Sequence, residues 1–217
     1  MIMFKPKFEL TPKLLGNITK IERLYGQIEG LKIPQKLELN LHRDNLIQSS
    51  YASNSIEGNP LSLREVTNLL LGERVPVNRE EKEVKNYFEI LKQIGKEYST
   101  LDIDTILKIH RQLLEGVENE IGGEIRDRKV VVGNPTQDGT IVIKHEPPKH
   151  TRKEIEGLFK ELLDWTNTSE ELPILKAGIY HHEFVYIHPF VDGNGRVCRL
   201  TTTLLLDKLG YEINKYF

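Results

Sequence analysis

The chain has 217 residues, enough for one domain with a sizeable core, and its 38% hydrophobic and 29% charged residues are typical of a globular protein. Its formal net charge of -2 gives no electrostatic reason to expect nucleic acid or an anionic membrane as a partner, and its one cysteine excludes an internal disulfide. Lys5, Pro6 and Lys7 interrupt the N-terminus, which does not resemble a signal peptide, and no apolar run is long enough to span a membrane. We expect a cytoplasmic protein.

Most of the chain has helical patterning. Residues 34 to about 55 are amphipathic, and residues 80 to about 98 are charged and favour a helix. Between them, residues 72–78 include Gly72 and Pro76 and predict a loop. Three later segments place apolar residues at helical spacing, which predicts helices with one buried face. Their apolar residues are Ile106, Ile109 and Leu113; Ile155, Leu158, Phe159, Leu162 and Leu163; and Val197, Leu200, Leu204 and Leu205.

Two local features stand out between these helices. Residues 129–133 and 140–144 are rich in β-branched residues and flank turn-forming residues, so they predict a β-hairpin over residues 129–144. A hairpin in a helical protein is equally compatible with a plain structural element packed on helices. After it, Thr151 and Glu154 form a capping-box pattern, which predicts a helix from Thr151 to about Trp165.

The densest group of chemically useful residues lies in the run HPFVDGNGRVCR at residues 188–199. Pro189 and the glycine-rich residues end one helix, and a new helix is expected to begin near Asn194. Such a helix start presents free backbone N–H groups and the positive end of the helix dipole, which together bind phosphate. Gly193 and Gly195 lack a Cβ and allow the backbone to approach a phosphate closely.

Four side chains complete this segment. Arg196 and Arg199 lie three residues apart on the new helix, where two guanidinium groups can hold a polyphosphate. Asp192 offers a hard oxygen ligand for the Mg²⁺ of a nucleotide, and the ordinary pKa of His188, about 6.5, suits a general base. Each feature alone has a plain structural explanation, such as a cap, a turn or a core histidine. Together they indicate a nucleotide-binding catalytic loop.

The run HPFVDGNGRVCR resembles the signature of the Fic family at every defining position, and the segments AGIYHHEF at 177–184 and GEIR at 123–126 extend the similarity. The resemblance covers roughly residues 39–210. It implies a mainly α-helical Fic fold, a helical bundle with one β-hairpin flap. It also implies an adenylyltransferase that moves AMP from ATP, with Mg²⁺, onto a Ser, Thr or Tyr hydroxyl of a target protein. The target is expected to dock on the 129–144 hairpin as an extra strand.

The resemblance implies a role for each residue of the motif. His188 would take the proton of the target hydroxyl, Asp192 would bind Mg²⁺, and Phe190 would anchor the loop in the core. The implied nucleotide-binding residues are Gly193, Asn194 and Gly195 for the α- and β-phosphates, Arg196 for the β-phosphate and Arg199 for the γ-phosphate.

A second motif lies upstream, in the run SNSIEGN at residues 53–59. It resembles the inhibitory pattern of the Fic class with an N-terminal inhibitory helix, with Ser53, Glu57 and Gly58 at its defining positions. The resemblance implies that Glu57 pairs with Arg199, takes the place of the γ-phosphate and blocks productive ATP binding. The same residues also have the pattern of a plain helix end with a Gly-Asn-Pro stop.

We therefore expect an N-terminal helical region over residues 1–95 that carries the inhibitory motif, and a catalytic core over residues 96–217, packed as one globular unit. Transfer of UMP or phosphocholine, or removal of AMP with help from Glu57, remains an alternative on the same fold. A kinase-like subtype is disfavoured because it has lysine at the position of Gly195. A non-catalytic binding module is the alternative outside enzymes, and the intact His188 argues against it. Self-modification and a regulatory homodimer are both open.

Overall fold

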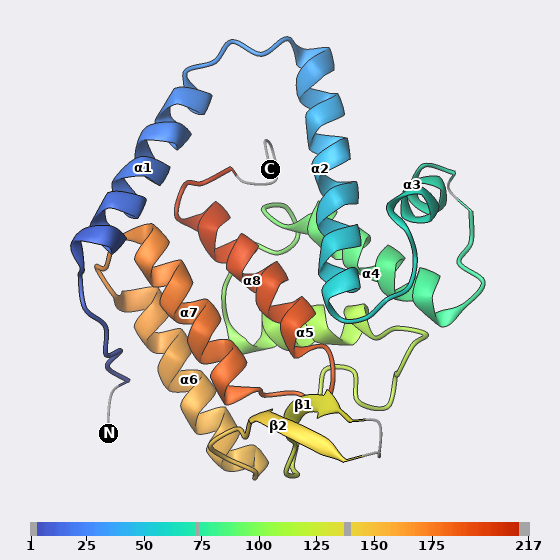
Figure 1. The fold of residues 1–217 in the computed structure, drawn as a ribbon, viewed down its shortest axis with the longest axis vertical. Coiled ribbons are helices and arrows are strands. Elements are labelled where there is room, and N and C mark those ends of the chain that lie inside the picture. The colour runs from blue at the N-terminus through green and yellow to red at the C-terminus, as the bar shows by residue number, and fades with distance from the viewer. Residues whose placement is uncertain (1–3, 73, 137–139, 213–217) are drawn as a thin grey trace.

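The computed structural model describes residues 4–72, 74–136 and 140–212. Within these ranges the chain forms eight helices and a two-stranded sheet (Figure 1). In chain order the elements are α1 (Pro12–Glu29), α2 (Gln35–Ile56), α3 (Leu63–Leu71), α4 (Arg79–Gln93), α5 (Ile103–Leu113), β1 (Val132–Pro135), β2 (Ile141–His145), α6 (Arg152–Thr168), α7 (Pro173–Ile187) and α8 (Asn194–Lys208).

The main core lies among α4 to α8, and α2 packs against α4 and α8. The predicted apolar faces of α5, α6 and α8 line this core, which confirms the helical periodicity. α7 packs on both α6 and α8, so α8 is held from several sides. This packing fixes the start of α8, where the predicted phosphate-binding loop lies.

One helix boundary and one helix cap differ from the sequence prediction. α4 ends at Gln93 rather than near residue 98, because Ile94 is extended and Gly95 has a φ of 79°. Glycine adopts that φ freely, and the Gly95 N–H donates to the Tyr98 carbonyl to close the turn. The expected capping box at Thr151 is also wrong.

The start of α6 is not stabilised by the predicted capping box. The Thr151 hydroxyl donates to the Glu154 carboxylate at 2.7 Å instead of accepting a backbone N–H, and Lys149 holds the same carboxylate. The N–H of Arg152 donates to Asp127. A complete capping box occurs instead at the start of α3, between Ser62 and Glu65.

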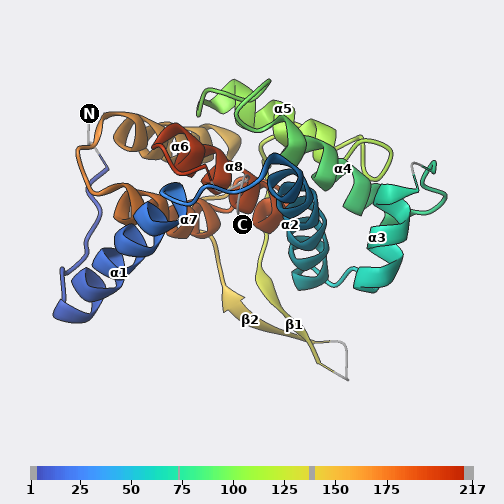
Figure 2. The ribbon, with the colours of Figure 1, turned by 90° about the horizontal axis from the view of Figure 1, so that it is seen from above.

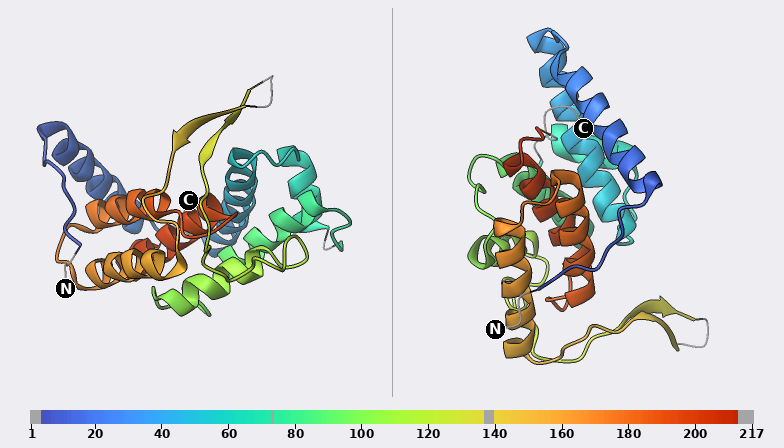
Figure 3. Two further views of the ribbon diagram at one scale, coloured as in Figure 1. Left: turned by 90° about the horizontal axis from the view of Figure 1, so that it is seen from below. Right: turned by 90° about the vertical axis from the view of Figure 1, so that its left-hand side faces the viewer.

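The predicted hairpin is present, with β1 and β2 antiparallel and a register irregularity between Val132 and Gly133. Its first strand begins at Val132 rather than at residue 129 and extends to Pro135, and residues 137–139 of its turn lie outside the described residues. Ile141, Val142 and Ile143 are 54%, 56% and 55% exposed. Figures 2 and 3 show the hairpin projecting from the helical body, so it does not pack on helices as a plain structural element would.

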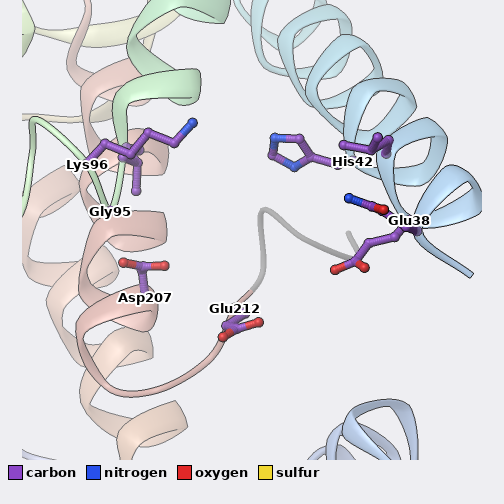
Figure 4. A pocket seen from close by; sticks show the side chains of 9 residues that line it. Glu38, His42, Gly95, Lys96, Asp207 and Glu212 are labelled. Carbon is purple, nitrogen blue, oxygen red and sulfur yellow. The ribbon is translucent and has the colours of Figure 1, made fainter. Parts of the chain in front are cut away.

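At the other end of the molecule, α1 and the first half of α2 form an arch away from the bundle (Figure 1). A cavity of about 480 Å³ lies there, lined by Glu38 and His42 of α2, by Lys96, and by Asp207 near the end of α8 (Figure 4). It is therefore remote from the start of α8. Among the described residues, no helix has the length and apolar character needed to cross a membrane.

Candidate active site

The loop between α7 and α8 begins at His188. The backbone of His188 is left-handed, with φ 51° and ψ 63°. In the described ranges, His188 is the one residue other than glycine with a positive φ. L residues rarely adopt this conformation, which turns the chain sharply at the end of α7. The loop then runs past the buried Phe190 to Gly193, which has a φ of 77° and directly precedes the first residue of α8.

The start of α8 presents three backbone N–H groups that have no partner within the helix. The Val197 N–H donates to the Gly193 carbonyl, and the helical N–H of residues 194–196 has no carbonyl one turn earlier within the helix. The Asn194 side chain does not face a ligand: its amide donates to and accepts from the Phe190 backbone, both at 2.9 Å. Asn194 therefore closes the loop and has only its backbone N–H to offer an anion.

Arg196 is held inside the core of the loop. Its side chain is 4% exposed, and its Nη2 lies 3.2 Å from Asp192 Oδ2 while its Nη1 lies 3.6 Å from Glu83 Oε1. The Nε of Arg196 is buried and has no hydrogen-bond partner in the part of the chain that the structure describes. Asp192 is 40% exposed, and its Oδ1 accepts the Gly193 N–H at 2.6 Å.

Arg199 is held from outside the loop, by the last turn of α2. Its Nε donates to Ser53 Oγ at 2.7 Å, and its Nη2 donates to the Ser53 carbonyl at 3.0 Å and to Glu57 Oε1 at 2.6 Å. The Glu57 carboxylate also lies directly over Gly195, where a methyl group in place of hydrogen would collide with it. A carboxylate thus lies at the glycine where close approach of a phosphate was expected.

The end of α2 is a Schellman motif. Gly58 has a φ of 89° and its N–H donates to the Ser55 carbonyl, while the Asn59 N–H donates to the Asn54 carbonyl. The plain helix-end interpretation of this motif is therefore correct. It coexists with the Glu57–Arg199 pair, because the cap fixes where the last turn of α2 presents Glu57.

His188 itself is partly buried at the base of the hairpin. Its Nδ1 lies 3.4 Å from the Val185 carbonyl, which leaves Nε2 as the nitrogen free to accept a proton when Nδ1 carries the hydrogen. Burial lowers the pKa of His188, and the hydrogen bond with Val185 opposes that shift; Arg126 and His145 add to it, and Glu57 opposes it. The imidazole is therefore held in its neutral form at neutral pH.

His110 of α5 is a residue of this site that the sequence analysis missed. Its ring stacks on Phe190 with 3.8 Å between centroids, its Nδ1 accepts the Gly123 N–H at 2.9 Å, and its Nε2 lies 3.1 Å from the Asp192 carbonyl. Burial lowers the pKa of His110 to about 4, so Nε2–H of a neutral ring donates to Asp192. Its position on an apolar helix face, beside Ile106 and Ile109, was the available signal.

The fold and the loop define a helical domain in which a glycine-rich helix start with two arginines follows the loop, and from which a hairpin projects. Residues 100–206 match the family model described as Fic/DOC family. The chain therefore contains a Fic/DOC family domain over these residues, and the predicted Fic fold is confirmed.

The chain is similar to curated proteins named protein adenylyltransferase. It is 33% identical to fic-1 of Caenorhabditis elegans over 172 residues, covering 74% of this chain and 32% of that protein. It is 31% identical to Fic of Aedes aegypti over 206 residues, covering 88% of this chain and 39% of that protein. The chain thus spans about a third of the length of these relatives.

Solved structures extend the similarity over nearly the whole chain. A Fic family protein from Desulfovibrio desulfuricans superimposes with a TM-score of 0.83 at 30% identity, covering 98% of this chain and 62% of the other. Fic-1 of C. elegans, residues 134–508, superimposes with a TM-score of 0.73 at 27% identity, covering 92% and 60%.

Proposed function

We propose that this chain is a protein adenylyltransferase that transfers AMP from ATP to a Ser, Thr or Tyr hydroxyl of a target protein. The observation that carries the proposal is the start of α8, where backbone N–H groups, Arg196 and Arg199 surround one glycine a few residues from His188. The buried Nε of Arg196 lacks a partner among the described residues, and a phosphate oxygen would satisfy it. Relatives named protein adenylyltransferase support the choice of AMP.

Asp192 fits the Mg²⁺ that accompanies a nucleotide. Its carboxylate is a hard oxygen donor, is 40% exposed, and lies beside the first turn of α8. Mg²⁺ is commonly bound by one or two carboxylates together with phosphates and water. When bound by Asp192, Mg²⁺ would neutralise charge on the departing pyrophosphate.

The proposed reaction is a displacement at the α-phosphorus. Neutral His188 takes the proton of the target hydroxyl at Nε2 as the hydroxyl oxygen forms a bond to the α-phosphorus. The bond from the α-phosphorus to the bridging oxygen breaks, and pyrophosphate leaves with that oxygen. The N–H groups of residues 194–196 and the Arg196 guanidinium stabilise the developing negative charge.

We propose that the target segment docks on the hairpin. The side chains of Ile141, Val142 and Ile143 are exposed, and a two-stranded sheet has an edge on each strand that can accept a further strand. The His145 ring Nε2 lies 2.8 Å from the Tyr186 carbonyl, so the base of β2 is linked to α7 close to His188. A docked strand would thus present its hydroxyl near the base.

We further propose that α2 inhibits this reaction, with residues 1–95 as the regulatory part and 96–217 as the catalytic part. Glu57 holds Arg199 and lies over Gly195, so a nucleotide must displace a carboxylate and its negative charge to bind productively. Ser53 adds two bonds to Arg199, and Gly58 fixes the end of the helix. AMP removal by a water that Glu57 orients is the second candidate, favoured by the carboxylate lying over Gly195.

Labelling with α-³²P-ATP and Mg²⁺ tests the proposal on the wild-type chain, Glu57→Gly and His188→Ala. Strong self- or target-labelling by Glu57→Gly, little by wild type and none by His188→Ala is the expected result. Labelling from UTP or CDP-choline but not ATP would replace AMP by another group. Release of AMP from a labelled target by wild type but not by Glu57→Gly would favour AMP removal.

A further inference from the structure

Arg126, between α5 and β1, is a buried arginine held by carbonyl oxygens. Arg126 is 2% exposed, and its guanidinium forms no ion pair with a residue in the described ranges. Its Nε donates to the His188 carbonyl at 2.7 Å, its Nη2 to the Ile187 carbonyl at 3.2 Å, and its Nη1 to the Arg128 carbonyl at 2.9 Å. A buried charge is costly unless such bonds compensate it.

The backbone of Arg126 also binds the residue that follows His188 in the loop. The Arg126 N–H donates to the Pro189 carbonyl at 3.0 Å, so residue 126 contacts three consecutive carbonyls, those of residues 187, 188 and 189. The last carbonyls of a helix lack partners within the helix and carry the negative end of its dipole. Arg126 therefore caps α7 at the residue where the chain turns left-handed.

We propose that Arg126 is the positioning residue for His188: its guanidinium fork fixes the left-handed backbone of residue 188 and thereby the direction of the imidazole. The inference rests on the proposed function in that His188 is the base. A backbone φ of 51° is rarely adopted by L residues, so it needs support from its surroundings. The carbonyl bonds of Arg126 provide that support on both sides of the His188 Cα.

The shape of the guanidinium matters as much as its charge. Nε and Nη2 diverge toward the carbonyls of two adjacent residues, 188 and 187, while Nη1 points back to residue 128. A lysine ammonium is a compact charge on a flexible stem and cannot bridge these three acceptors in fixed directions. Arg126→Lys thus keeps the charge and removes the fork. Arg128→Lys is the matched control, because Arg128 is exposed.

The experiment uses the Glu57→Gly chain as parent, with Arg126→Lys and Arg128→Lys added separately. Single-turnover transfer at saturating ATP–Mg²⁺ is expected to slow roughly 10- to 100-fold for Arg126→Lys, since a displaced reacting group costs about that much. The Kd for ATP should change by less than about 2-fold, because the start of α8 is untouched. Transfer by Arg126→Lys at the rate of Arg128→Lys, or an equal loss of ATP affinity and rate, overturns the proposal.

An NMR measurement separates this inference from the proposed function. Arg126→Lys should shift the backbone resonances of residues 187–189 and the ring resonances of His188, and should leave the Gly195 resonances unchanged. The His188 ring resonances are assigned by their loss in His188→Asn. This holds whether or not any nucleotide is transferred. Unchanged His188 resonances overturn the inference even if AMP transfer is confirmed. Should Arg126→Lys not fold, hydrogen exchange of the Arg126 Nε–H in the unaltered chain decides: exchange as fast as that of Arg128 rejects the clamp.

Discussion

The two ends of the 188–199 segment are held by different parts of the chain. At the His188 end the supports are Arg126 and the buried contacts around Phe190, all within the residues that match the Fic/DOC family. At the Arg199 end the supports are Ser53 and Glu57 of α2, outside that match. The first set is buried, and the second includes a carboxylate that is 35% exposed.

The His188 end is held in place by buried contacts, whereas the Arg199 end is held by contacts through which α2 can regulate the site. Arg196, 4% exposed, is bound by Asp192 and Glu83, neither of which lies in α2. Arg199, 24% exposed, is bound by groups that an incoming polyphosphate can replace. Changes at the His188 end should therefore lower the rate of the proposed transfer, and changes in α2 should raise it.

The largest effect is expected for His188→Ala in the Glu57→Gly chain. Loss of a general base lowers the rate about 10²- to 10⁴-fold, while ATP binding at the start of α8 stays intact. Radiolabel transfer and calorimetric ATP titration measure the two quantities on the same sample. A variant that transfers AMP normally would show that His188 is not the base.

The opposite sign is expected for Glu57→Gly. Removing the carboxylate from Arg199 and Gly195 should raise transfer by roughly 10- to 100-fold, since about 1.4 kcal/mol corresponds to a factor of ten. Adding Arg199→Ala should then lower the rate again, because the γ-phosphate would lose its contact with the Arg199 guanidinium. Equal rates for Glu57→Gly with and without Arg199→Ala would contradict the role given to the pair.

The pH dependence of the transfer rate tests whether His188 is held in its neutral form. Burial lowers the pKa of His188, and only its neutral form accepts a proton. The rate of the Glu57→Gly chain should therefore stay level as pH falls through the ordinary value of about 6.5 and decline about tenfold per pH unit only below the lowered pKa. A decline that begins above pH 6.5 would show that the imidazole is not held neutral.

A smaller change, in stability, is expected for His110→Phe. Phenylalanine preserves the stacking on Phe190 but leaves the Gly123 N–H and the Asp192 carbonyl without the imidazole. Unsatisfied buried groups cost about 1–3 kcal/mol each, so urea unfolding at pH 7 should show a loss of that order. Asp104→Asn, at an exposed position near the start of the same helix, leaves the loop bonds in place and serves as the comparison; an equal loss there would contradict the special role of His110.

How far the sequence predicted this molecule depends on the range of each interaction. The start of α8 was predictable because glycines, a helix start and two arginines are local features. The Glu57–Arg199 contact joins residues 142 positions apart, and only the family resemblance pointed to it. His110 was not singled out, and Arg126 was noted only as part of the family resemblance, because a buried histidine or arginine shows its partners only in the folded chain. The capping box failed at Thr151 because its hydroxyl donates to Glu154 instead of accepting a backbone N–H.

The smallest expected effect concerns Ser53→Ala, which tests whether α2 holds Arg199 by more than one charge. The hydroxyl accepts from Arg199 Nε at 2.7 Å, and the Ser53 carbonyl and Glu57 would keep their own bonds to Nη2. One hydrogen bond of about 0.5–1.5 kcal/mol corresponds to a rise in wild-type transfer of roughly 2- to 10-fold, well below that of Glu57→Gly. Ser55→Ala, at an exposed position of the same turn, should leave the rate unchanged. If Ser53→Ala instead matched Glu57→Gly, the hydroxyl would be the principal restraint on Arg199 and the carboxylate a secondary one.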